Sequence, residues 1–377
     1  MSGRCERGLM RIRTDGSRTL LRLAVIPLMM AATLAKLDCL HAAQDHLHRE
    51  IHVIQELLPP GLVSALAWSS DGTRLAVATL GEGAAIPLSP PIYLGNPFGR
   101  LITIFNSDGV VSQQIRRDKG FFTLDERIAF VADNTQIATP PPQESEASAF
   151  SIYNLGDGAE GREIPGPNPT SGRLTNRGTR IVVSPDQSIL AVAFPIGRSV
   201  ALYSTRDWKR VAELPYQSLG SAQAPHDLSF SGDGRFVAIL GWGVIHIYSV
   251  ASYQLIREFH VGQLATSIAL NRDGSKFALG YSGRGTSVQI LDSTQENILA
   301  REFHGHDAIS GLTWSPDDRF VAFILGYRML HLWSPFSRDT GTRVIDLGSS
   351  TVFSFSPDGR RIAAKSARAI KILNIGQ

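Results

Sequence analysis

A short sequence pattern recurs along the chain and constrains its fold more than any other feature. Six copies align on a turn and on the run of residues after it: SSDGTRLAVAT, SPDQSILAVAF, SGDGRFVAILG, NRDGSKFALGY, SPDDRFVAFIL and SPDGRRIAAKS. A seventh copy, FTLDERIAFVA, fits with one residue deleted. The turn aspartates are Asp71, Asp125, Asp186, Asp233, Asp273, Asp317 and Asp358, and successive copies are 54, 61, 47, 40, 44 and 41 residues apart. Such a period indicates a chain built from one repeated structural unit.

Each copy has the pattern of several short strands separated by turns. In Ser-Pro-Asp-Gly, proline sets φ, the aspartate side chain can bond nearby amides, and glycine accepts a positive φ. The runs on either side of the turn alternate with the period of two expected of strands. A third run ends in an aromatic residue or leucine, as in VIHIY and MLHLW, and most copies add a fourth, more polar run. Four strands in units of roughly 40–50 residues predict the blades of a β-propeller.

An alanine also recurs after the turn aspartate. It follows five residues later in six copies, and in the second copy it is Ala129, four residues after Asp125. We expect it where a neighbouring sheet approaches too closely for a larger side chain. The pattern as a whole predicts an all-β fold, a single seven-bladed β-propeller of four-stranded antiparallel blades.

The last copy of the repeat has only three strand-like runs, in SPDGRRIAAKSARAIKILNIGQ. Near the other end of the chain, HREIHVIQELLPPGLVSALAW aligns with the runs that precede inner strands elsewhere. Residues 49–57 are therefore predicted to be an outer strand that completes the last blade beside AIKILNI, which would leave no open edge in the ring. An amphipathic helix over QDHLHREIHVIQELL is the alternative.

The segment FHGHDAISGLTWSPDDRFVAFILGYRMLHLWSP has the most specific motifs. It contains Gly305-His306, a Ser-Pro-Asp turn, and Trp333 at the end of its third run. In these features it resembles the WD-repeat (WD40-like) seven-bladed β-propellers, and the resemblance extends over about residues 48–377. The aspartate usual at that family's second hairpin is absent, because Leu325-Gly326-Tyr327 stands there. The family's buried hydrogen-bond tetrad is therefore not expected, although the fold is.

Residues 1–43 differ in composition from the rest. They contain seven basic and three acidic residues, and the 13 residues from Leu23 to Ala35 are uncharged. A basic region, an apolar run shorter than the about 20 residues of a membrane span, and small residues after it are the layout of a signal peptide. We predict a signal peptide or disordered leader over residues 1–43, a propeller over residues 44–377, and export to the periplasm or medium. A cytoplasmic or membrane-anchored protein is the alternative.

The charge balance bears on the kind of partner, and the positions of the cysteines bear on whether disulfides stabilise the fold. Beyond the leader the chain has 30 basic and 31 acidic residues, so a nucleic-acid partner is not expected. Cys5 and Cys39 both precede Ala43. The propeller would therefore be stabilised by packing, without disulfides.

Two long, proline-rich segments, GEGAAIPLSPPIYLGNPFG and DNTQIATPPPQESEAS, are predicted as loops between the second and third strands of blades 1 and 2. Long loops on a rigid scaffold often carry function. Several arginines are predicted to enter third strands on the same face, where guanidinium groups could bind carboxylates or phosphates, or could pair with acidic neighbours within their own blade. The candidate partner-binding residues are Tyr93, Phe98, Arg100, Arg198, Trp242, Arg284, Tyr327 and Arg328.

The sequence contains none of the short motifs of common hydrolases, metalloproteases or nucleotide-binding enzymes. His304 and His306 are expected in a loop, and no catalytic residue, metal or cofactor is predicted. We predict a monomeric, non-catalytic scaffold whose partner is a protein or peptide, with an acidic one among the candidates, and no stable membrane span in the mature form. A propeller enzyme, lactonase-like or another hydrolase with its site at the mouth of the central channel, is the alternative. An envelope propeller resembling the periplasmic Tol-system protein is a third.

Overall fold

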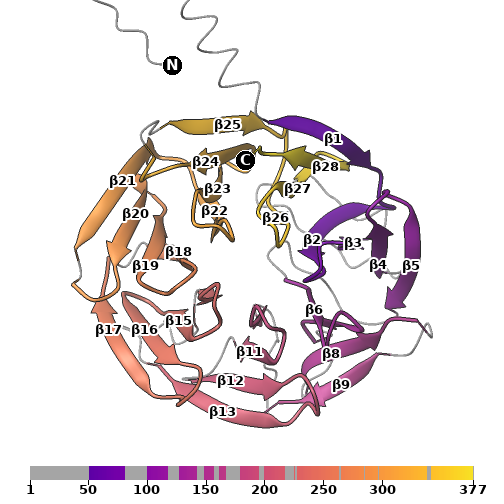
Figure 1. The fold of residues 1–377 in the computed structure, drawn as a ribbon, viewed down its shortest axis with the longest axis horizontal. Helices are drawn as coiled ribbons and strands as arrows, with labels where there is room; N and C mark the ends of the chain where they lie inside the picture. The colour runs from indigo at the N-terminus through magenta and orange to yellow at the C-terminus, as the bar shows by residue number, and fades with distance from the viewer. Residues whose placement is uncertain are drawn as a thin grey trace, which may run out of the picture. The chain divides into compact units, whose positions relative to one another are not determined.

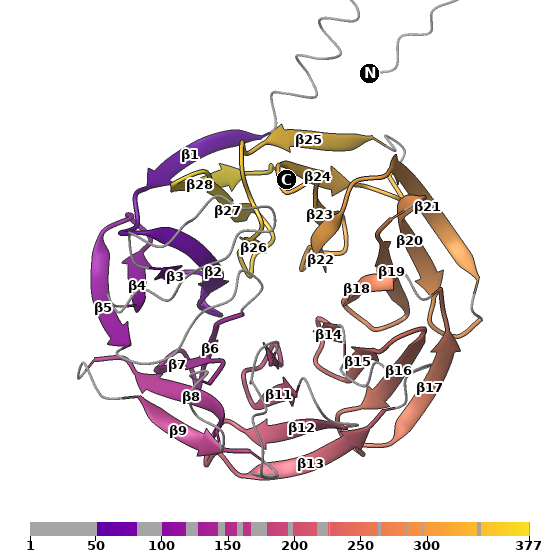
Figure 2. The same ribbon diagram turned by 180° about the vertical axis from the view of Figure 1, so that it is seen from behind.

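Seven antiparallel sheets follow one another around a ring, and each sheet has four strands (Figures 1 and 2). The computed structural model describes residues 51–80, 100–117, 127–141, 148–156, 161–166, 179–194, 199–216, 225, 227–262, 265–283, 285–295, 297–337 and 341–376. Six of the sheets are meanders in chain order, such as β2-β3-β4-β5, and their first strands surround the central channel. The predicted seven-bladed propeller is confirmed.

The four strands of each blade follow one another from the channel outward. Blade 1 has β2 (Leu62–Trp68), β3 (Arg74–Leu80), β4 (Arg100–Asn106) and β5 (Val111–Arg117), and blade 2 has β6 (Ala129–Val131), β7 (Gln136–Thr139), β8 (Ser148–Asn154) and β9 (Arg162–Pro165). Blade 3 has β10 (Arg180–Val183), β11 (Ile189–Ala193), β12 (Ser199–Ser204) and β13 (Arg210–Pro215), and blade 4 has β14 (Asp227–Phe230), β15 (Phe236–Leu240), β16 (Val244–Ser249) and β17 (Leu255–His260). Blade 5 has β18 (Ala265–Leu270), β19 (Lys276–Tyr281), β20 (Thr286–Asp292) and β21 (Ile298–Gly305), and blade 6 has β22 (Ile309–Trp314), β23 (Val321–Leu325), β24 (Met329–Trp333) and β25 (Thr342–Asp346). Blade 7 has β26 (Phe353–Phe355), β27 (Arg361–Ser366), β28 (Ala369–Asn374) and β1 (His52–Leu57).

The last blade is completed by the N-terminal strand, as predicted. β1 pairs antiparallel with β28, from His52 opposite Asn374 to Leu57 opposite Ile370. In Figure 1 the indigo β1 lies along the outer side of the yellow β28. The helical alternative is wrong for residues 52–57, while the rest of that segment and the predicted leader, residues 1–43, lie outside the described residues.

The core consists of seven clusters of buried side chains, each shared by two neighbouring blades. The alanine five residues after the turn aspartate is fully buried in six blades, at Ala76, Ala191, Ala238, Ala278, Ala322 and Ala363. Its small side chain lets the adjacent sheet pack close by, as the sequence pattern predicts. Within the described residues there is no helix with the length and apolar character needed to cross a membrane.

One hydrogen-bond pattern holds the repeated turn. In blade 6, Ser315 Oγ donates to Asp317 Oδ1 at 2.7 Å, and the amide of Arg319 donates to the same oxygen at 3.2 Å. The amide of Phe320 in turn donates to Ser315 Oγ at 2.9 Å. Equivalent Ser–Asp pairs lie at residues 69 and 71, 184 and 186, 231 and 233, and 356 and 358, while Asn271 takes the place of serine beside Asp273. The aspartate therefore recurs because its carboxylate closes the turn.

These turns predict a loss of stability in acid. Hydrogen bonds from Ser275 lower the pKa of Asp273 to about 2, and a hydrogen bond from Ser69 lowers the pKa of Asp71. A carboxyl whose pKa is lower in the folded chain than in the unfolded chain stabilises the fold above the unfolded value of about 3.9. That contribution is lost as pH falls through the folded pKa. We therefore expect the Tm to be nearly constant from pH 7 to about pH 5 and to fall steeply toward pH 2.

Substitution of the turn aspartates tests this origin of the acid sensitivity. Asp71→Asn combined with Asp273→Asn should lower the Tm at pH 7 by a few degrees and flatten its fall below about pH 4, as followed by circular dichroism. Asp133→Asn is the matched control, because Asp133 is an exposed turn residue with no side-chain hydrogen bond to any described residue. A double variant that keeps the wild-type acid profile would show that other carboxyls cause it.

The sequence pattern places the second copy of the repeat one strand too early. The turn between the first two strands of blade 2 contains Asp133 and Asn134, and Ala138, five residues after Asp133, is fully buried. Ala129 instead begins the inner strand β6, and Asp125 lies outside the described residues. The error arises because Asn134, at φ 62°, takes the place of the usual glycine, so no Ser-Pro-Asp-Gly signature marks the turn. The segment predicted as a long loop, residues 133–148, begins with this turn and with strand β7.

The prediction that His304 lies in a loop is also wrong. The pairing of β21 with β20 continues as far as Gly305 opposite Thr286, so His304 is a strand residue of blade 5. The Gly-His motif is therefore the end of a strand, and His306 lies in the turn after it.

Candidate functional site

The turns between second and third strands lie on the same face of the propeller as the connections that enter each blade. The amide of Ala367, in the β27–β28 turn, donates to Ser349 O at 3.1 Å, and the amide of Ser350 donates to Tyr327 O at 2.8 Å. Ser349 and Ser350 precede the inner strand of blade 7, so these bonds join the two kinds of connection. We call this side the entry face.

Three of the eight predicted partner-binding residues are described with their side chains, and all three lie on the entry face. Trp242 is half-buried in the β15–β16 turn, while Tyr327 and Arg328 belong to the β23–β24 turn. The other five are not: Arg100 starts β4 but its side chain lies outside the described part, as do Tyr93, Phe98, Arg198 and Arg284. Among the arginines of these eight candidates, Arg328 is the one whose side chain the structure describes.

Arg328 is paired within its own blade. Its Nε donates to Asp346 Oδ1 at 2.8 Å, and its Nη2 donates to the other carboxylate oxygen. The bonds from Arg328 hold the pKa of Asp346 at about 2. Tyr327 beside it is 57 % exposed at φ 55°, so the ring remains accessible while the arginine is already engaged.

The inner strands enclose the channel, which contains two overlapping cavities of about 530 and 460 Å³. Every blade contributes to the wall of the larger one, through residues that include Leu66, Arg127, Arg180, Leu228, Ile268, Ser310 and Thr351. Most of these residues lie at or near the start of an inner strand, or just before it. They therefore form the mouth of the channel on the entry face.

One ion pair bridges the mouth between blades 2 and 4. Arg127 Nη2 lies 2.6 Å from Asp227 Oδ1, and Arg127 Nη1 donates to Leu228 O at 3.1 Å. The Asp227 side chain is only 4 % exposed, and it also accepts the amides of Leu228 at 3.0 Å and Ile268 at 3.1 Å. Two backbone donors and one guanidinium thus satisfy a buried carboxylate, and Arg127 is neutralised.

Arg180 is the cation of the mouth that stays free within the described part of the chain. It is the first residue of β10, it is half-buried, and it lines the larger cavity. Ser310 Oγ and Thr351 Oγ1 line the same cavity and are buried without a hydrogen-bond partner among the described residues. The mouth therefore combines one unpaired guanidinium with two unsatisfied hydroxyls, which is a set suited to a carboxylate ligand.

Arg127, Arg180 and Asp227 are absent from the predicted contact residues, because the arginines predicted there enter third strands whereas these three lie at inner strands. The available signal was weak: a charged residue at or just before the start of the inner strand in three successive blades.

Comparison with known families agrees with the geometry. Residues 297–334 match the family described as WD domain, G-beta repeat. The matched segment contains β21, the outer strand of blade 5, followed by β22, β23 and β24, the first three strands of blade 6. The match therefore begins in one blade and ends in the next. A search of curated proteins found no match. The protein is thus a seven-bladed β-propeller, and one segment of it is similar to a WD40 repeat. Propellers built from WD40 repeats commonly serve as protein-interaction scaffolds.

Proposed function

We propose that the protein is a non-catalytic scaffold that binds an acidic segment of a protein partner at the mouth of the channel on the entry face. The observation that carries this proposal is Arg180, a half-buried guanidinium without a partner among the described residues. A buried or half-buried charge costs free energy unless a counter-charge reaches it, so a carboxylate ligand would supply what the fold leaves unmet. The hydroxyls of Ser310 and Thr351 would donate to the same ligand.

The proposal also covers where the protein acts and in what state. The uncharged run after a basic region in residues 1–43 supports export, which N-terminal sequencing of the purified protein would test. Closure of the ring by β1 supports a monomer, because the seventh blade offers no missing strand for a second chain to supply. Sedimentation analysis would test the monomer.

Removal of the Arg180 guanidinium should weaken binding of acidic peptides. We expect Arg180→Ala to reduce the affinity for a glutamate- and aspartate-rich peptide by about 10–100-fold, because a hydrogen-bonded charge contributes about 1.5–3 kcal/mol. Fluorescence polarisation with labelled acidic, neutral and lysine-rich peptides of equal length would measure this. The acidic peptide should also bind more weakly as the salt concentration rises.

Arg206→Ala is the matched control for that experiment. Arg206 is exposed and lies in the turn between β12 and β13, on the opposite face of the same blade. It should leave affinity unchanged. Equal binding by wild type and Arg180→Ala, or tighter binding of the lysine-rich peptide than of the acidic one, would refute the proposal.

A further inference from the structure

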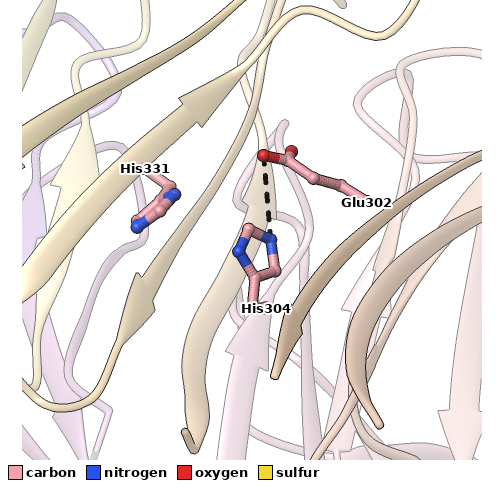
Figure 3. Close-up of side chains that lie close together, drawn as sticks. All are labelled: Glu302, His304 and His331. Atoms are coloured by element: carbon pink, nitrogen blue, oxygen red, sulfur yellow. Dashed lines mark ion pairs between the residues drawn. The ribbon is translucent and has the colours of Figure 1, made fainter. Parts of the chain in front are cut away.

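Two neighbouring blades bring three metal-ligating side chains together outside the channel. Glu302 and His304 lie on β21, the outer strand of blade 5, and His331 is the central residue of β24 in blade 6. Side chains alternate along β21, so Phe303 is 67 % exposed while Glu302 and His304 are largely covered. Figure 3 shows Glu302 and His304 joined as an ion pair with the ring of His331 alongside. None of the three residues lines the two channel cavities.

The distances suit a single bound ion. One ligand atom from each residue lies within 4.8 Å of the other two, and His304 Nε2 is 3.8 Å from Glu302 Oε1. Two ligand atoms that bind one zinc ion at about 2.1 Å in a tetrahedral arrangement are about 3.4 Å apart. The side chains would thus have to approach one another by about 1.4 Å at most, which side-chain rotation can supply.

Each of the three side chains also has an unsatisfied polar atom. Glu302 Oε2, His304 Nε2 and His331 Nδ1 are buried and have no hydrogen-bond partner among the described residues. Buried polar atoms without partners destabilise a fold, and they are uncommon in native proteins. Because the three side chains lie side by side, a ligand that accepts electron pairs from all of them could satisfy these atoms, and a metal ion is such a ligand.

The surroundings hold the three groups in place. Phe323 stacks on His331 with ring centroids 5.0 Å apart, and it meets the edge of His304 at 4.9 Å. Thr342 Oγ1, on β25, donates to Glu302 Oε1 at 2.6 Å and leaves Oε2 for another partner. An aromatic wall and an oriented carboxylate are the kind of outer contacts that fix metal ligands.

The neighbouring blade provides a contrast within the same chain. The tetrapeptide Arg-Glu-Phe-His occurs at residues 257–260 and again at 301–304. In blade 4, Glu258 Oε2 lies 3.0 Å from His246 Nε2, directly across the strand pair, and His260 is 69 % exposed. There the histidine and glutamate bond each other within one blade. In blade 5, Glu302 stands opposite Val288, and the two imidazoles it meets come from its own strand and from blade 6.

We propose that Glu302, His304 and His331 bind one zinc ion, or another divalent transition-metal ion of similar preference, in the seam between blades 5 and 6. Two imidazoles and a carboxylate are a set that zinc favours, and water would complete four-coordination. Because the ligands come from adjacent blades, the ion would fasten one blade to the next and stabilise the ring.

Zinc titration of the full chain tests this proposal. After treatment with EDTA and its removal, competition with a chromophoric chelator should show a site with a Kd of about 1 μM or tighter that depends on these residues. His331→Phe preserves the stacking on Phe323 and should remain folded, while its zinc affinity falls by at least about 100-fold. His304→Phe should lose affinity to the same extent, and Thr342→Val should lose about 10–100-fold through the released carboxylate.

His260→Ala is the matched control, because it removes the histidine of the other Arg-Glu-Phe-His copy, and it should bind zinc as the wild type does. Thermal unfolding gives a second readout. Zinc should raise the Tm of wild type and of His260→Ala, but not that of His331→Phe. Absence of zinc uptake by the wild type, or wild-type affinity retained in both His304→Phe and His331→Phe, would overturn the proposal.

Discussion

A chain that starts at residue 59 is expected to unfold at least about 10 °C below one that starts at residue 44, or not to fold at all. The shorter chain lacks β1, so β28 loses its outer partner along the register from His52 to Leu57. It also loses Leu57, which is 5 % exposed and packs with Ile370 and Ile372 in the cluster between blades 7 and 1.

The size of this effect follows from what is removed. Loss of a buried leucine side chain alone costs about 2–5 kcal/mol, and each lost backbone hydrogen bond costs about 0.5–1.5 kcal/mol more. Together these approach the about 5–15 kcal/mol by which whole domains are stable. The newly exposed edge of β28 would also be free to pair with other chains, so aggregation should accompany the loss.

Point substitutions in β1 distinguish the contribution of its buried side chain from that of its backbone pairing with β28. Leu57→Ala should lower the free energy of unfolding by about 2–5 kcal/mol, whereas Val53→Ala should change it by less than about 0.5 kcal/mol, because Val53 is 53 % exposed on the same strand. Chemical denaturation with guanidinium chloride would measure both. If the chains starting at 44 and 59 had equal Tm values, β1 would contribute nothing to closure.

Most of the fold could be predicted from the sequence, because each repeated turn is held by residues a few positions apart and the same residues recur in most blades. Asp317 closes its own turn through Ser315 and Arg319, so every copy of that turn leaves the same short signature in the sequence. The one blade that was misassigned is the one whose turn, at Asp133 and Asn134, uses a different set of residues. Closure by β1 could be predicted for the same reason. The segment that forms β1 resembles the outer-strand segments of other blades, and the last copy of the repeat lacks such a segment.

The candidate sites could not be predicted in the same way, because they are assembled across blades. Arg127 and Asp227 are 100 residues apart and meet only because the ring curves around the channel. His304 and His331 belong to successive blades, and their separation in the sequence is not that of a known metal-binding motif, so the sequence does not show that their rings are in contact. Each of these residues, taken alone, reads as an ordinary polar residue of a strand.

Asp227→Ala is expected to lower the free energy of unfolding by about 2–6 kcal/mol, because a buried donor left without an acceptor costs about 1–3 kcal/mol and two are left. The substitution leaves the amides of Leu228 and Ile268 without an acceptor, and both residues are 1 % exposed. Arg127→Ala should cost less, because the carboxylate would keep its two amide donors. Urea denaturation of the two variants gives the comparison, and an equal or reversed order would show that the amide bonds contribute little.

Substitutions at Asp227 should change peptide affinity and stability in opposite directions, which would not be expected if its ion pair with Arg127 were only structural. In Asp227→Asn the amide oxygen can still accept one backbone bond, but the charge that neutralises Arg127 is gone. The channel mouth would then present two cations, Arg127 and Arg180, so an acidic peptide should bind several-fold more tightly although the fold is less stable. Arg127→Ala should act in the opposite sense, since it leaves the charge of Asp227 unopposed on β14, the inner strand that neighbours β10 with Arg180. Fluorescence polarisation with the acidic peptide would record both changes, and affinities that simply follow the loss of stability in both variants would contradict a carboxylate-binding mouth.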